Sequence, residues 1–277
     1  MLRNILVGVD GSEYSKSALE QCIRWSRQFD ILLVGLGIVD EPAIRSPAMT
    51  PIGGNYYKEL SDDARVEHSR KQVKQFLERF ALRCTEAGVS YQLVEEVGDP
   101  CSQFVLAAQR YDLIALGQQT HFQFATQDDP DAFFPTLLKN APRPVVTVPL
   151  KLTDGKSVVI AYDGSLQAAR TLQAFQASGL GQIGEVHIIS IGTDHVATVR
   201  DANRAVEFLS FHGIKATPHN LSPSHSVADV ILTQAKQLDA QLVVIGAYGQ
   251  STLREFFFGS VTRSILRNAE VPLFVYH

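Results

Sequence analysis

The sequence predicts an α/β protein made of two tandem, doubly wound, mostly parallel sheets of five strands, with helices on both faces of each sheet. Three observations support this prediction. The chain has 277 residues, and division by about 150 residues per domain gives a number near two. Three sequence blocks occur twice, in the same order. Short apolar runs alternate with longer amphipathic stretches, which is typical of parallel strands covered on both faces.

The repeated blocks define the two copies. The first block is an apolar run ending in Asp-Gly-Ser, the second is an apolar run ending in glycine, and the third is Asn-Ala-x-x-Pro before an apolar run. The matching anchors are Asp10 and Asp163, Gly117 and Gly246, and Pro144 and Pro272, at offsets of 153, 129 and 128 residues. We therefore interpret the chain as two domains, 1–150 and 156–277, joined by a short linker.

The individual elements follow from the same patterns. In the second copy, apolar runs predict strands at 157–162, 185–191, 214–219, 241–245 and 271–276. Helical periodicity predicts helices at 165–178, 196–212, 226–238 and 260–268. The falling offset places an insertion in the first copy, whose Pro/Gly-rich start predicts a loop over 41–61 and then a helix over 62–87.

Composition excludes several classes of protein. The formal net charge is −4, and no basic patch is present, so neither nucleic acid nor a membrane surface is an expected partner. The sequence has no apolar run long enough for a membrane span and no signal-peptide pattern at its start. Three widely spaced cysteines suit a reducing compartment, which favours the cytoplasm.

Some patterns resemble binding motifs but lack the context that the chemistry requires. The run from Gly179 to Gly184 spells GxGxxG, yet it follows a predicted helix, so we interpret it as a helix C-cap and turn. His212, His219 and His225 match no metal-ligand spacing and are expected to be exposed strand-end and loop histidines, so no metal site is predicted. Phe256–Phe258 favours a core or subunit contact over a ligand-stacking platform. No P-loop and no GxSxG elbow occur.

The second copy carries a more complete pattern. Asp163-Gly164-Ser165 follows its first strand, where glycine permits a tight turn, serine can cap the next helix, and Asp163 either completes the turn or accepts hydrogen bonds from a base or ribose. After the fourth strand comes Gly246-x2-Gly249-x9-Gly259-Ser260, before a helix beginning near Val261. The glycines would let the backbone approach a ligand, and the helix N-terminus would bind phosphate oxygens. Arg254 and Arg263 can add positive charge.

With this aspartate and this loop, the chain resembles the universal stress proteins, as a tandem-type member with two such domains. The resemblance implies an adenine nucleotide alpha-hydrolase-like fold and a site for ATP, ADP or AMP, bound with or without Mg²⁺. It also implies that 145–150 and 271–276, the last strands of the copies, pair edge to edge as an internal pseudo-dimer, and it leaves a homodimer of the whole chain open. Carried over by position, the adenine and ribose contacts fall on Ala161, Tyr162, Asp163 and Ile191. The phosphate and ribose contacts fall on Ile245, Gly246, Gly249, Gly259, Ser260 and Val261.

The first copy departs from the loop pattern. It keeps Asp10-Gly11-Ser12, and Ile38 matches Ile191, but Thr120 stands in place of the second glycine. The loop that follows carries Asp128, Asp129 and Asp131, and no Lys or Arg occurs from 111 to 138. Because these carboxylates would repel a triphosphate, we expect the first nucleotide site to be degenerate.

These observations favour a cytoplasmic sensor or signalling protein of the stress response that binds one adenine nucleotide in its second domain. It would act through a protein partner or a conformational change, and no catalytic residues are predicted. Two alternatives stay open. One is a slow ATPase or nucleotidyl-transfer enzyme, for which Asp163, Glu255 and the loop hydroxyls are the local candidates. The other is an interaction scaffold whose two sites are both vestigial.

Overall fold

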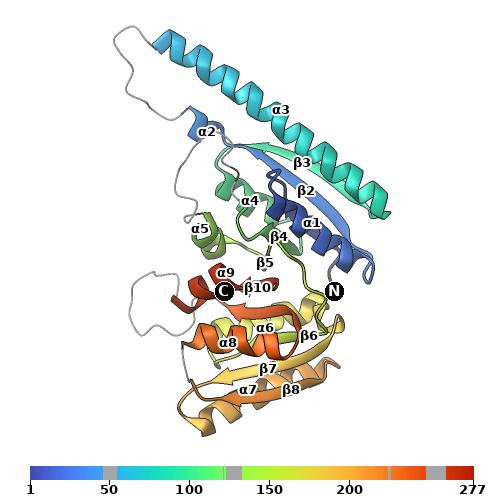
Figure 1. Cartoon of the computed structure of the whole chain (residues 1–277), viewed down its shortest axis with the longest axis vertical. Coiled ribbons are helices and arrows are strands. Elements are labelled where there is room, and N and C mark those ends of the chain that lie inside the picture. Colours follow the sequence, from blue (N-terminus) through green and yellow to red (C-terminus); the bar gives the residue numbers. More distant parts are fainter. Residues whose placement is uncertain (46–54, 121, 123–132, 224–225, 248–259) are drawn as a thin grey trace. The chain divides into compact units, whose positions relative to one another are not determined.

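A computed structural model of the chain describes residues 1–45, 55–120, 122, 133–223, 226–247 and 260–277. The chain divides into two compact units. We call residues 4–142 the N-terminal unit, and residues 1–3 with 143–277 the C-terminal unit. Each is an α/β layer structure in which helices cover a central sheet (Figure 1). No helix among the described residues is long and apolar enough to cross a membrane.

The N-terminal unit has four parallel strands in the order β3-β2-β1-β4. The strands are β1 (Asn4–Gly8), β2 (Leu32–Val39), β3 (Tyr91–Val97) and β4 (Leu113–Gly117). Its longer helices are α1 (Glu13–Ser26), α3 (Asn55–Ala87), α4 (Pro100–Ala108) and α5 (Phe133–Asn140). Gly35 and Gly117, on one face of the sheet, lie against α3 and α1, whereas Gly8 points to the opposite face and lies against Phe104 of α4. Helices therefore cover both faces, as predicted.

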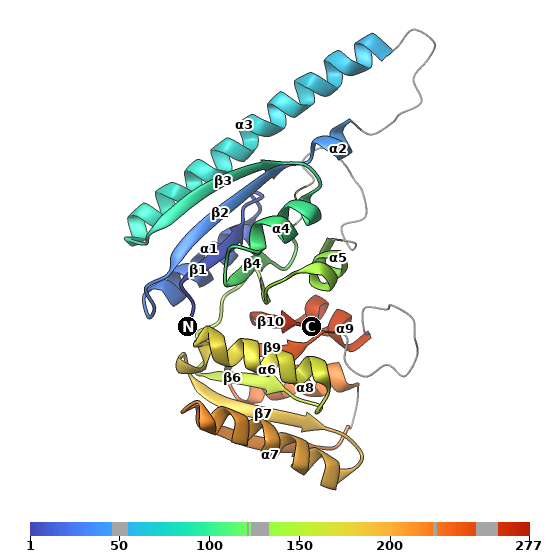
Figure 2. The ribbon, with the colours of Figure 1, turned by 180° about the vertical axis from the view of Figure 1, so that it is seen from behind.

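The C-terminal unit has the strand order β5-β10-β9-β6-β7-β8, in which only β5 runs antiparallel to its neighbour. The strands are β5 (Val145–Val148), β6 (Ser157–Ala161), β7 (Glu185–Ile191), β8 (Ala216–Leu221), β9 (Ala240–Gly246) and β10 (Leu273–Tyr276). The helices are α6 (Leu166–Ser178), α7 (His195–Phe211), α8 (Val227–Gln237) and α9 (Ser260–Asn268). Figures 1 and 2 show α6 and α7 on one face of this sheet and α8 on the other. The predicted fold class is confirmed.

Strand β5 lies in the C-terminal unit although the repeat assigns it to the first copy. It pairs antiparallel with β10, and Val146 lies opposite Phe274. These two residues are equivalent in the repeat, since 274 − 146 equals the offset of 128. On either side, Leu273 lies opposite Thr147 and Val275 lies opposite Val145. Because Leu273 is the equivalent of Val145 and Val275 that of Thr147, the two flanking pairs are related by a local two-fold axis between the strands. The predicted pairing of the last strands is therefore confirmed.

The first residues of the chain also belong to the C-terminal unit. The Leu2 N–H donates a hydrogen bond of 2.8 Å to the Ser178 carbonyl at the end of α6, and the N-terminal amine binds the Ala177 carbonyl. At this same end, Gly179 adopts a left-handed conformation (φ +81°) and closes α6 as its C-cap. The interpretation of the GxGxxG letters as a cap and turn is thus confirmed.

The insertion in the first copy is more helical than predicted. A short helix, α2 (Glu41–Ile44), begins it, and α3 starts at Asn55, seven residues before the predicted start at Asp62. Gly54 is the last helix-breaking residue before α3, so nothing prevents the earlier start. Arg45 fixes α2 to α3 by pairing with Asp63 at 2.7 Å. The prediction of a loop over 41–61 was therefore wrong at both of its ends.

Candidate functional site

The candidate site lies at the carboxyl ends of β6, β7 and β9. Within the sheet, β7 and β8 follow on one flank of β6, and the chain then returns to form β9 on the opposite flank of β6. Parallel sheets bind ligands at such a switch point. The strand pairing places six of the predicted site residues at this one edge, namely Ala161, Tyr162, Asp163, Ile191, Ile245 and Gly246.

The turn after β6 has the predicted local chemistry. Gly164 has φ +74°, which glycine adopts without strain. The Ser165 hydroxyl caps α6 by accepting a hydrogen bond of 3.1 Å from the Ala168 N–H. One carboxylate oxygen of Asp163, Oδ1, accepts the Ser165 N–H at 3.0 Å. Within the described residues this is the one hydrogen bond that Asp163 receives, and its side chain is exposed. Asp163 therefore completes the turn and still presents acceptor capacity to solvent.

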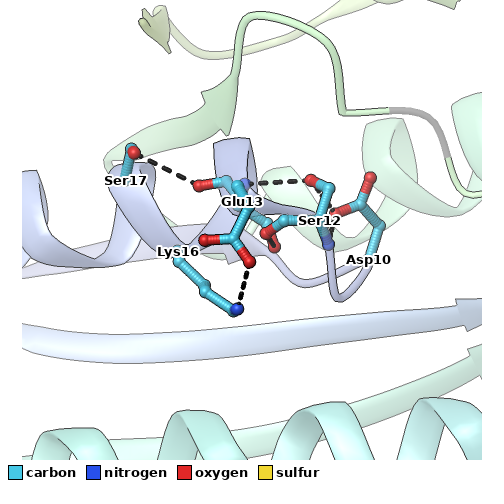
Figure 3. A network of polar contacts seen from close by, with 6 residues as sticks. Asp10, Ser12, Glu13, Lys16 and Ser17 are labelled. Carbon is cyan, nitrogen blue, oxygen red and sulfur yellow. Dashed lines mark hydrogen bonds and ion pairs between the residues drawn. The ribbon is translucent and has the colours of Figure 1, made fainter. Parts of the chain in front are cut away.

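The matching turn in the N-terminal unit is closed. Asp10 is only 7% exposed, and its Oδ1 accepts hydrogen bonds from both the N–H and the hydroxyl of Ser12, at 3.0 and 2.6 Å (Figure 3). The ring of Phe76 on α3 lies so close to Gly11 that a Cβ there would fall 2.4 Å from it. The two turns share one conformation, but the aspartate is buried in one unit and exposed in the other.

The segment after β4 also differs from a nucleotide loop. Thr120, which stands where the pattern has its second glycine, is fully buried, and its hydroxyl has no hydrogen-bond partner in the described part of the chain. Phe122, two residues further along the chain, is also buried. The centre of its ring lies 5.1 Å from that of Phe104 and 5.9 Å from that of Phe133. Apolar packing therefore replaces the polar environment that phosphate needs. The acidic residues Asp128, Asp129 and Asp131 lie outside the described residues.

Gly246 has a structural role that the sequence interpretation missed. A Cβ at this position would lie 3.0 Å from the backbone nitrogen of Ala168 and 3.1 Å from the carbonyl carbon of Gln167, in the first turn of α6. At the equivalent Gly117, a Cβ would lie 2.4 Å from the carbonyl carbon of Tyr14 in α1. Close packing between helix and strand is therefore a reason for glycine at both positions that does not depend on a ligand.

The loop predicted to bind phosphate is only partly described. Gly249, Arg254, Phe256–Phe258 and Gly259 lie outside the described residues, as does the side chain of Ser260. Helix α9 begins at Ser260, and Val261 in its first turn is exposed. A helix start at this point agrees with the prediction, and its N-terminal amides and dipole favour an anion.

One charged cluster next to the site was not identified from the sequence. Asp201 on α7 lies against Gly164, and it pairs with Arg200 and Arg204. Burial, followed by the negative charges of Asp201 and Asp163, raises the pKa of the Tyr162 phenol, whereas Arg204 lowers it. The only sequence signal was the Arg-Asp-x-x-Arg spacing on a helix, which is common on solvated surfaces.

The histidines differ from expectation in one respect. His219 is not an exposed strand-end residue, because its Nε2 lies 3.0 Å from Nδ1 of His187 on the neighbouring strand β7. Burial and the neighbouring His187 lower the pKa of His219. His212 is the C-cap of α7, and His225 lies outside the described residues. Among the residues that the structure describes, no group of three or more potential ligands could hold a metal ion.

Comparisons with known proteins agree with this architecture. A family model described as the universal stress protein family matches residues 1–122 and 213–277. The universal stress protein Slr1230 of Synechocystis sp. strain PCC 6803 is 22% identical over 99% of this chain and 100% of its own length. Among solved structures, a universal stress protein of Archaeoglobus fulgidus DSM 4304 aligns over 99% of this chain and 95% of its own, with 21% identity and a TM-score of 0.65. A protein of unknown function from Pseudomonas aeruginosa PAO1 aligns over 99% and 92%, with 19% identity and a TM-score of 0.58.

Proposed function

Since the chain belongs to the universal stress protein family, we propose that it binds one adenine nucleotide, in the C-terminal unit, and that this binding is its signal. The observation that carries the proposal is the contrast between the two Asp-Gly-Ser turns. Asp163 is exposed and retains acceptor capacity, whereas Asp10 is buried and bonded to Ser12. A ligand can therefore reach the carboxylate of one turn and not that of the other.

The proposed roles of the site residues follow from their places at the sheet edge. Asp163 accepts hydrogen bonds from the ribose or the base. The strand ends at Ala161, Tyr162 and Ile191 contact the base through backbone atoms and apolar side-chain atoms. Ile245 and Gly246 form the floor on the β9 side. The loop residues Gly249, Gly259, Ser260 and Val261 bind ribose and phosphate through backbone amides and a hydroxyl. ATP is the leading ligand, with ADP and AMP as the others, and Mg²⁺ would accompany the phosphates.

Calorimetric titration of the full chain with ATP and Mg²⁺ tests the proposal. One site per chain is expected. Asp163→Ala should weaken binding, and the matched variant Asp10→Ala should leave the affinity unchanged. Two equivalent sites, or loss of binding in Asp10→Ala with Asp163→Ala unaffected, would assign the ligand to the other unit. No binding by the wild type would instead favour the scaffold alternative.

Two loop variants test the phosphate contacts. Gly249→Asp should nearly abolish binding, since it adds a side chain and a negative charge beside the phosphates. Ser260→Ala should be milder, because one hydrogen bond to a charged oxygen contributes about 1.5–3 kcal/mol. If both variants bind ATP as the wild type does, the phosphates do not lie on this loop.

Signalling rather than turnover is the role that we propose, with a protein partner reading the bound state. The alternative of a slow ATPase or nucleotidyl-transfer enzyme is tested by incubating the protein with ATP and Mg²⁺ and measuring ADP and AMP. Product formation well above the contaminant level that is lost in Ser260→Ala would favour the enzyme. Full recovery of ATP would favour the binding role.

A further inference from the structure

The two Asp-Gly-Ser turns are covered by chemically different side chains. In the N-terminal unit, the helix between the second and third strands of the copy, α3, places the apolar ring of Phe76 against Gly11. In the C-terminal unit, the equivalent helix, α7, places the carboxylate of Asp201 against Gly164. The position of Gly164 in the repeat matches that of Gly11. The helix that covers the turn therefore makes one site wall apolar and the other polar and charged.

Asp201 is oriented by its neighbours. Its Oδ1 accepts a hydrogen bond of 3.2 Å from Nε of Arg200 and lies 3.6 Å from Nη1 of Arg204. Its other oxygen, Oδ2, lies only 3.0 Å from the place where a Cβ of Gly164 would be, and within the described residues it makes no hydrogen bond. The side chain is 15% exposed. Both oxygens of Asp201 thus lie against the turn that carries Asp163, Oδ1 at 3.2 Å from the same Cβ position, and the two arginines hold Oδ1 only.

We propose that Asp201 is a specificity-determining residue of the nucleotide site, which, together with Asp163, selects nucleotides whose ribose carries free 2′- and 3′-hydroxyl groups over those with a phosphate on one of these two oxygens. This inference rests on the proposed function. A carboxylate accepts hydrogen bonds from hydroxyl groups, and such charge-assisted bonds are stronger than neutral ones. It repels a phosphate in the same place, and the repulsion grows as water is excluded. A nucleoside 5′-phosphate has both hydroxyl groups free, whereas a 3′,5′-cyclic nucleotide keeps only the 2′-hydroxyl and carries phosphate on the 3′ oxygen.

The test is calorimetric titration of the full chain with AMP and with 3′,5′-cyclic AMP. The wild type should bind AMP at least about ten-fold more tightly, and Asp201→Asn should reduce this ratio by about ten-fold, the effect of one charge-assisted hydrogen bond or more. Asp201→Glu keeps the charge and should keep the preference for AMP. Glu207→Gln is the matched control, because it removes one exposed carboxylate from the same helix, about 9 Å further along its axis, and it should leave the ratio unchanged.

The outcomes separate the two proposals. If the wild type binds neither nucleotide, the proposed function fails, and this inference fails with it. If AMP binds but Asp201→Asn leaves the ratio within two-fold of the wild type, the site stands and the role of Asp201 is refuted. If Asp201→Asn does not fold by circular dichroism, Asp201→Glu decides alone, since a loss of its preference for AMP would refute the inference.

Discussion

Replacing Gly246 by alanine separates a packing role from a ligand role at the site. The new Cβ would lie 3.0 Å from the backbone of α6, against about 3.4 Å for ordinary contact, so helix and strand must separate by roughly 0.4 Å. Overpacking of this kind costs about 1–3 kcal/mol. At Gly117 the corresponding distance is 2.4 Å, which requires a shift of roughly 1 Å in backbone, so Gly117→Ala should cost more than about 3 kcal/mol.

The single tryptophan makes the two variants distinguishable. Trp25 is buried in α1 of the N-terminal unit, so its fluorescence reports the unfolding of that unit, while far-ultraviolet circular dichroism reports both units. In urea, Gly117→Ala should lower the midpoint of the fluorescence transition. Gly246→Ala should lower the midpoint of a transition seen by circular dichroism, and its loss of nucleotide affinity should not exceed its loss of stability.

One result would refute this reasoning. If Gly246→Ala unfolds at the urea concentration of the wild type but binds ATP ten-fold or more weakly, the missing side chain serves approach to the ligand, as the sequence pattern suggested. Unchanged stability in Gly117→Ala would contradict the packing account for both units, since the closer contact lies there.

Acid should destabilise the C-terminal unit, because burial and the neighbouring His187 lower the pKa of His219 below its ordinary value of 6.5. Below pH 6.5 the unfolded chain then binds more protons at this histidine than the folded unit does. The contribution of His219 to the free energy of unfolding should therefore be fully present above pH 6.5 and decline as the pH falls below that value. Urea midpoints at pH 7.5 and 5.5 measure this decline. Glu20→Gln should cost less than about 1 kcal/mol in the same assay, because the side chains of its bidentate pair with Arg83 are 40% and 35% exposed. The cysteine thiols should react slowly with a disulfide reagent at pH 8 and completely after unfolding, because burial raises the pKa of all three, to about 12 for Cys84 and about 11 for Cys101.

Each of these predictions has a result that contradicts it. A loss of stability at pH 5.5 that is as large in His219→Gln as in the wild type would show that another group is responsible. A cost of more than 2 kcal/mol in Glu20→Gln would mean that the pair with Arg83 is not screened by water as its exposure implies. Rapid labelling of the native protein would show that a thiol is more accessible than its burial allows.

The order and type of the elements could be predicted from the sequence because their signals are local. A continuously apolar run of five to seven residues specifies a buried strand, and a serine after Asp-Gly caps the helix that follows, whatever surrounds it. The start of α3 was missed for a related reason. The helix propensity of 55–61 was present in the sequence, but the Pro/Gly-rich stretch before it led to the prediction of a longer loop.

The sequence by itself determined the two copies, their alternating strands and helices, the chemistry of both Asp-Gly-Ser turns and the resemblance to the family. Only the tertiary structure decided that Phe76 covers one turn and Asp201 the other, that Gly246 packs against α6, and that His219 faces His187. The pairing of β5 with β10 was expected from the family resemblance, and the structure confirmed it. The physical reason is that propensities and caps act over a few neighbouring residues. The environment of a site residue depends instead on side chains that the fold brings together from distant parts of the chain.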